Sequence, residues 1–200
     1  MIPFKISKEE VNALELGAFP GNIILIEDET GLREMEQDLK ASQIIGFDTE
    51  TRPAFRKGVS YEVALLQLST TENAYLIRLN HTGFPPGAKA ILENPNIVKV
   101  GAAVRDDLKA LKKIAPNFEP DSFFDLNEEL KRVGFLNVGV RNLSAMVLGI
   151  RISKSEQVSN WEAPVLTAKQ MLYAATDAWA CLEIFLRLQE EGLLDEIFST

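Results

Sequence analysis

The sequence predicts an α/β domain: a mixed sheet of five or six strands flanked by helices. Two apolar, strand-like runs in the first half of the chain are separated only by a short polar turn. The strand-like runs in the second half alternate with amphipathic helices. A chain of 200 residues, 46% hydrophobic and 25% charged, can enclose one substantial core. We therefore expect one domain over residues 1–200, with an entry segment at 1–21 and the core at about 22–194.

The first half of the core is predicted to be mostly strands. The expected elements are a strand at Asn22–Asp28, a helix at Thr30–Ser42, and strands at Gln43–Glu50, Val63–Thr70 and Asn73–Asn80. Leu32, Met35 and Leu39 recur at helical spacing, which predicts a buried side for the first helix. Only a short turn joins the last two strands, so we expect them to pair antiparallel.

The second half is predicted to alternate helices with strands. The expected elements are a helix at Gly87–Glu93, a strand at Ile97–Ala102, a helix at Val104–Ala115, a short strand at Ser122–Leu126, a helix ending near Arg132, a small helix near Asn142–Leu148, and a long helix from Thr167 to about Glu191. Thr167 and Gln170 have the spacing of a capping box, which marks the start of the last helix.

Composition limits the class of protein. No apolar run approaches the roughly 20 residues that span a bilayer. The N-terminal sequence resembles neither a signal peptide nor a transit peptide, so we expect a cytoplasmic location and no membrane partner. The single cysteine, Cys181, lies in an apolar helical stretch and is expected to be a core residue. A net charge of −8 argues against broad, nonspecific adhesion to nucleic acid.

The stretch IIGFDTET, residues 44–51, brings two acids to the end of an apolar strand. Asp48 and Glu50 are two residues apart, so a strand places both carboxylates on one face. Two neighbouring carboxylates at the edge of a core repel each other, and a bound cation would relieve that repulsion. The alternative is that both acids are solvated and only terminate the strand.

Two further places carry acids in unusual positions. Asp177 lies in the middle of a predicted helix that is apolar almost all round, with Tyr173 one turn earlier on the same face. Asp106 and Asp107 begin a helix directly after a strand, where acids are also favoured for purely structural reasons.

Taken together, FDTE, VGAAVRDDLKAL and YAATD resemble the three motifs of the DEDD 3′–5′ exonucleases, in that order. The spacing of Tyr173 and Asp177 resembles the tyrosine subgroup, which includes ribonuclease D and the Werner-type exonuclease domains. The other subgroup has a histidine where this chain has Leu172, and the single histidine, His81, is far away. The run SNWEAPVLTAKQMLYAATDA resembles the Werner-type branch, and the resemblance extends from about Asn22 to Leu194.

This resemblance implies a ribonuclease H-like fold and a hydrolase that uses two divalent ions, Mg²⁺ or Mn²⁺. It implies that Asp48 bridges the ions, that Glu50 and Asp177 complete one site, and that Asp107 holds the second ion largely through water. We choose Asp107 over Asp106 because its offset from Gly101 matches the family. Tyr173 would orient the attacking water.

The implied substrate is the 3′ end of nucleic acid: single-stranded or 3′-recessed DNA, with RNA possible and the products nucleoside 5′-monophosphates. Candidate phosphate contacts are Arg52, Arg56 and Lys57 in the loop after the first motif, and Lys154 before the third. Each also fits a solvated surface residue. Two alternatives stay open: a catalytically silent nucleic-acid-binding module of the same fold, and a related hydrolase that cuts internally. The sequence indicates no particular protein partner.

Overall fold

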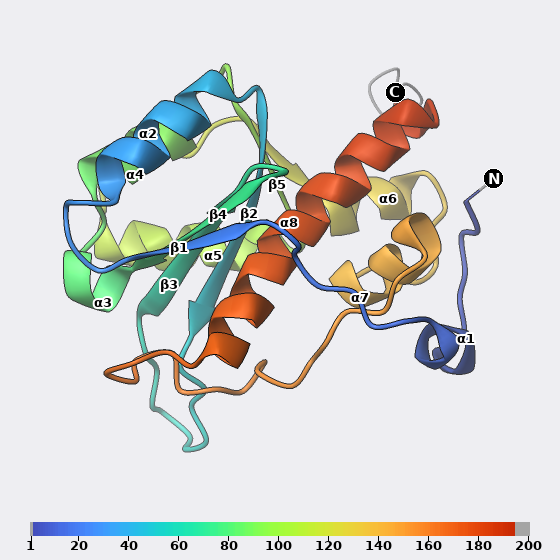
Figure 1. Ribbon diagram of the computed structural model, residues 1–200, viewed down its shortest axis with the longest axis horizontal. Helices are drawn as coiled ribbons and strands as arrows, with labels where there is room; N and C mark the ends of the chain where they lie inside the picture. The colour runs from blue at the N-terminus through green and yellow to red at the C-terminus, as the bar shows by residue number, and fades with distance from the viewer. Residues whose placement is uncertain (1, 195–200) are drawn as a thin grey trace.

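The computed structural model describes residues 2–194 and contains a six-stranded sheet in the order β1-β4-β3-β2-β5-β6 (Figure 1). The strands are β1 (Asn22–Ile26), β2 (Ile44–Thr51), β3 (Val63–Ser69), β4 (Asn73–Arg78), β5 (Val98–Gly101) and β6 (Phe123–Asp125). β3 pairs antiparallel with both β2 and β4, whereas the β1–β4, β2–β5 and β5–β6 pairs are parallel. The predicted mixed sheet and its antiparallel pair are thus confirmed.

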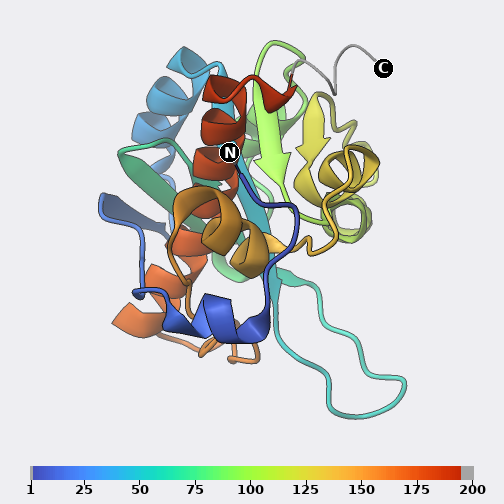
Figure 2. The same ribbon diagram turned by 90° about the vertical axis from the view of Figure 1, so that its right-hand side faces the viewer.

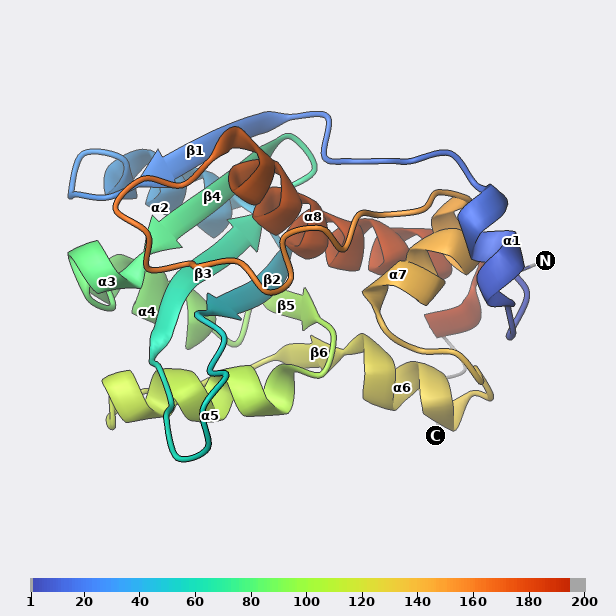
Figure 3. The same ribbon diagram turned by 90° about the horizontal axis from the view of Figure 1, so that it is seen from below.

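Helices cover both faces of this sheet (Figures 1 and 3). They are α1 (Lys8–Ala13), α2 (Leu32–Ala41), α3 (Leu79–Thr82), α4 (Pro86–Leu92), α5 (Val104–Ile114), α6 (Leu126–Arg132), α7 (Val140–Leu143) with a π-turn at Ser144–Leu148, and α8 (Ala168–Glu190). In Figure 3, α5 and α8 lie on opposite sides of β2. None of the helices within residues 2–194 is both long and apolar enough to cross a membrane.

The alternation of side chains along β2 divides it between the two faces. Ile45 and Phe47 are buried in a core that also contains Met35 and Leu39 of α2. Gly46, on the opposite face, lies directly against the backbone of α8. Since side chains alternate along a strand, Asp48 and Glu50 share the face of Gly46. Both acids therefore project toward α8.

Besides shifts of one or two residues at the ends of other elements, three elements differ from the sequence predictions. The entry segment contains α1, whose start is fixed by a capping box between Ser7 and Glu10. β4 ends at Arg78, two residues before the predicted strand end, and the chain turns at once into α3. The predicted small helix is a four-residue helix continued by a π-turn, which closes at Gly149 with φ of 68°. Residue 1 and residues 195–200 of the predicted domain lie outside the described residues.

Candidate active site

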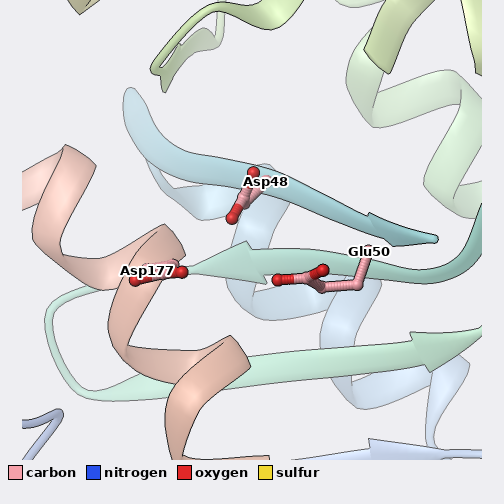
Figure 4. A group of neighbouring side chains, drawn as sticks. All are labelled: Asp48, Glu50 and Asp177. Atoms are coloured by element: carbon pink, nitrogen blue, oxygen red, sulfur yellow. The ribbon is translucent and has the colours of Figure 1, made fainter. Parts of the chain in front are cut away.

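Three carboxylates meet where β2 passes beneath α8. Asp48 and Glu50 project from the strand and Asp177 from the middle of the helix, with the three carboxyl groups turned toward one another (Figure 4). One carboxylate oxygen of each residue lies within 4.8 Å of the others. All three side chains are partly exposed, so ions and substrate can reach them from solvent.

The short distance between strand and helix depends on Gly46. A Cβ atom at this position would overlap the carbonyl oxygen of Ala178, the residue after Asp177, and the hydroxyl of Ser69. Only glycine permits this approach without displacing α8. The glycine therefore sets how close Asp177 comes to Asp48.

The start of α8 is fixed from two directions. Thr167 and Gln170 form the predicted capping box. The fully buried Arg78 at the end of β4 donates hydrogen bonds to the carbonyl oxygens of Ala163 and Pro164, and it pairs with Glu27 at 2.9 Å. These contacts attach the segment before α8 to the sheet and orient the helix that carries Asp177.

Burial raises the pKa values of the three acids, and neighbouring charges raise those of Asp48 and Glu50 further. Burial first, and then the charges of Asp177, Glu50 and Asp107, hold the pKa of Asp48 well above its usual range. Burial and the neighbouring charges of Asp177 and Asp107 raise the pKa of Glu50 to about 9. Burial raises the pKa of Asp177 to about 7. The site thus disfavours the ionised acids on their own, and oxygen ligands crowded in this way suit a hard divalent cation.

Tyr173 lies one helical turn before Asp177 and donates a hydrogen bond from its hydroxyl to that carboxylate. Its ring packs beside that of the fully buried Trp161, with ring centroids 6.0 Å apart. Burial and the nearby acids raise the pKa of the Tyr173 hydroxyl above its usual value. The tyrosine is therefore protonated at neutral pH and can donate a hydrogen bond, but it is a poor proton acceptor.

The structure separates the two neighbouring aspartates at the start of α5. Asp106 is exposed and pairs with Lys109 at 2.7 Å. Asp107 points inward and accepts a hydrogen bond from the hydroxyl of Thr49, which lies between Asp48 and Glu50 on β2. Burial raises the pKa of Asp107 to about 6. Among the described residues, the group of three acids does not include Asp107, but the charge of Asp107 contributes to the raised pKa values of Asp48 and Glu50.

Sequence reasoning missed Asp125, the residue that fixes the start of α5. Its carboxylate accepts hydrogen bonds from the backbone N–H groups of Ala103 at 2.9 Å and Val104 at 3.0 Å, and it also caps α6. Ala103 has the left-handed φ of 59° and redirects the chain from β5 into the helix that carries Asp107. An aspartate three residues before Glu128 is a helix-start signal that could have identified this cap.

Sequence reasoning also missed Gln67, which stands opposite Asp48 in the pairing of β2 with β3. Its side chain is fully buried, and neither its amide nitrogen nor its oxygen has a hydrogen-bond partner. Directly opposed residues of an antiparallel pair point to the same face. A polar group without a partner therefore lies beside the acids, and a single glutamine within the apolar run VALLQLS is the signal that could have revealed it.

The predicted phosphate contacts lie in two segments of the chain. Arg52 begins the loop between β2 and β3, where it pairs with Glu162 at 3.2 Å. Arg56 and Lys57 are exposed farther along the same loop. Lys154 lines a hollow of about 290 Å³ that also contains Tyr173 and Asp177.

Comparison with known proteins identifies a family and several relatives. The 3′–5′ exonuclease family model matches residues 23–192. The chain is 33% identical over 194 residues to the bifunctional 3′–5′ exonuclease/ATP-dependent helicase WRN of Mus musculus, covering 90% of this chain and 14% of that protein. It is 30% identical over 193 residues to ribonuclease D of Gluconacetobacter diazotrophicus, covering 90% and 47%. The chain thus spans less than half the length of either relative.

Solved structures share the fold. The EXO domain of Aedes aegypti Nibbler superposes with a TM-score of 0.78 at 24% identity, covering 90% of this chain and 99% of that one. RNase D of Escherichia coli superposes with a TM-score of 0.75 at 24% identity, covering 89% and 48%. The fold is therefore the ribonuclease H-like fold of exonuclease domains, and the chain belongs to the 3′–5′ exonuclease family.

Proposed function

We propose that this chain is a metal-dependent exonuclease that shortens nucleic acid from its 3′ end and releases nucleoside 5′-monophosphates. The observation that carries the proposal is the group formed by Asp48, Glu50 and Asp177. The pKa values of its acids are raised by burial and, for Asp48 and Glu50, also by the charges of nearby acids. A site that favours a bound cation in this way, on a chain of this family, supports hydrolysis of a phosphodiester.

The acids provide only oxygen ligands, which fits Mg²⁺ or Mn²⁺. Asp48, Glu50 and Asp177 would hold one ion, and Asp48 with Asp107 would hold the second. Bound divalent ions would activate a water for attack and neutralise the charge on the phosphate and on the departing 3′ oxygen. The raised pKa values mean that binding of the ions displaces protons from the carboxyl groups.

The other residues would position the reacting groups. Tyr173 would hydrogen-bond the attacking water and orient it, because its hydroxyl is held beside Asp177 and its raised pKa makes it a poor proton acceptor. Thr49 fixes the carboxylate of Asp107 by its hydrogen bond. Arg52, Arg56, Lys57 and Lys154 would contact phosphates of the substrate.

DNA is the substrate we favour, because the run before the third motif resembles the Werner-type branch. RNA is the competing substrate, because ribonuclease D is a relative of 30% identity. Both can be offered to the protein in one experiment.

The test is a ladder assay with 5′-labelled single-stranded DNA, 3′-recessed duplex DNA and single-stranded RNA. Each is incubated with Mg²⁺, Mn²⁺ or EDTA, for the wild type and for Asp48→Ala. We expect stepwise shortening of the DNA that requires metal and is absent in the variant. Intact substrates under every condition would contradict the proposal, and preferential shortening of the RNA would overturn the preference for DNA. Circular dichroism of the variant establishes that its fold is retained.

A further inference from the structure

The loop between β2 and β3 encloses a second hollow beside the candidate active site. Figure 2 shows this loop, residues 52–62, extending away from the body of the protein. The hollow has a volume of about 500 Å³. Its lining residues are Arg52, Pro53, Phe55, Arg56, Val59, Tyr61, Val158 and Asn160. Val158 and Asn160 belong to the segment that precedes α8.

This hollow is adjacent along the chain to the first hollow, which Tyr173 and Asp177 line. Gln157 lines the first hollow together with Tyr173 and Asp177, and the next residue, Val158, lines the second hollow. Arg52, which lines the second hollow, follows Glu50 by two residues and pairs with Glu162. An extended chain with its end at the acids can therefore run directly into the hollow.

The walls of the hollow combine exposed apolar surface with positive charge. Phe55 is 85% exposed and Val158 65% exposed, although large apolar side chains on soluble domains are usually more covered. The guanidinium of Arg52 lies over the ring of Tyr61, 4.7 Å from its centroid. Arg56 lines the same hollow, in a chain whose net charge is −8.

These features match the chemistry of one unpaired nucleotide. An aromatic ring without a covering neighbour can stack on a base, and guanidinium groups beside it can contact the flanking phosphates. The face of a base is free for stacking only when the strand is not in a duplex. No residue of the hollow belongs to the group of three acids, so a base held there would lie beside the cleaved position and not at it.

We propose that the hollow between residues 52–62 and residues 158–160 binds an unpaired base of the substrate strand, upstream of the phosphodiester that is cleaved. This inference rests on the proposed exonuclease function and adds that the preferred substrate has a single-stranded 3′ segment. Phe55 stacks on the base, and Arg56 contacts a phosphate.

The test measures binding separately from cleavage. A 5′-fluorescein-labelled single-stranded DNA of 12 nucleotides and a blunt duplex of the same sequence are titrated with protein in EDTA, with fluorescence anisotropy as the signal. Phe55→Ala should bind the single strand about tenfold more weakly than the wild type, because one stacking contact with a base is lost. Phe55→Trp should restore it, and binding of the duplex should not change. Arg56→Ala should weaken single-strand binding and reduce its salt dependence.

Leu136→Ala is the matched control, because Leu136 is a 73% exposed apolar residue that does not line the hollow. It should bind both probes as the wild type does. The subsite would be overturned if Phe55→Ala bound the single strand as tightly as the wild type does. It would also be overturned if Phe55→Ala lost binding of the duplex and of the single strand to the same extent.

Cleavage of the same strand with Mn²⁺ distinguishes this inference from the proposed function. Phe55→Ala should raise KM and leave kcat within about twofold, because uniform binding is lost and not the chemistry. If the wild type shortens the strand and Phe55→Ala has the same KM as the wild type, the subsite is contradicted and the exonuclease function is not. Single-strand binding that depends on Phe55, without shortening by the wild type, would contradict the exonuclease function and leave the subsite standing.

Discussion

At the scale of single residues, the two neighbouring aspartates at the start of α5 differ most sharply. Asp106 is exposed and paired with Lys109, whereas Asp107 is held by Thr49 beside the acids on β2. Only Asp107 is placed to affect an ion or a substrate at the site. The sequence offset from Gly101 favoured the same residue.

Replacement of these two aspartates tests that difference. Asp107→Ala should lower the rate of metal-dependent shortening at least about 100-fold, because a group that holds or orients a ligand is lost. Asp106→Ala should stay within about threefold of the wild type, since an exposed ion pair contributes little. Rates are measured on one labelled strand at saturating Mn²⁺. A larger loss in Asp106→Ala than in Asp107→Ala would transfer the role to Asp106.

Gln67 makes a second residue-scale prediction, concerning stability. Its buried amide has no hydrogen-bond partner, so the folded state bears a desolvation cost of about 1–3 kcal/mol. Gln67→Met keeps the length of the side chain and removes that cost. We expect the metal-free variant to melt about 2–12 °C above the wild type, as measured by calorimetry in EDTA. A lower melting temperature would mean that the folded protein satisfies the amide.

At the scale of elements, the strands and the long helix were predictable because their patterns are local. β2, β3 and β5 agree with the sequence prediction to within two residues at each end. The capping box of α8 is formed by the two residues that were predicted to form it. The π-turn at Ser144–Leu148 was not predictable, because no residue pattern distinguishes it from a short helix. The link from Asp125 to the start of α5 also escaped prediction. Its carboxylate binds the backbone N–H groups of residues that lie 21 and 22 positions away in the sequence.

The contact between β2 and α8 gives the prediction that belongs to this scale. Gly46→Ala inserts a methyl group into space occupied by the Ala178 carbonyl, so the helix must move away from the strand. We expect a loss of about 1–3 kcal/mol in the free energy of unfolding, together with weaker Mn²⁺ binding, because Asp177 moves away from Asp48. Urea unfolding and calorimetric titration measure the two effects.

Gly87→Ala is the comparison for that variant. A Cβ at Gly87 would also be crowded, but by the side chain of Glu36, which can rotate away. This contact is far from the acids. It should leave Mn²⁺ binding unchanged. If Gly46→Ala binds Mn²⁺ as tightly as the wild type, the glycine does not set the spacing of the acids.

At the scale of the whole molecule, the acidic site should oppose stability in the absence of metal. The pKa values of Glu50 and Asp177 are raised to about 9 and about 7, whereas unfolded carboxyl groups titrate near 4. Between these limits the folded chain binds more protons than the unfolded chain. The free energy of unfolding therefore falls as the pH rises through this interval. The three-residue group accounts for the direction of this effect.

A melting series in EDTA from pH 5 to pH 7 measures this effect. Each proton that the folded chain retains costs about 1.4 kcal/mol of stability per pH unit. One such proton over two pH units predicts a fall in melting temperature of about 5–10 °C. Asp48→Asn should reduce the fall, because it removes one carboxyl group whose pKa is raised in the folded chain. Saturating Mg²⁺ should reduce it in the wild type, because ions bind only the folded arrangement of ionised acids. A melting temperature that rises from pH 5 to pH 7 in EDTA would show that the carboxyl groups are stably ionised without metal, and the electrostatic argument for a cation at this site would fail.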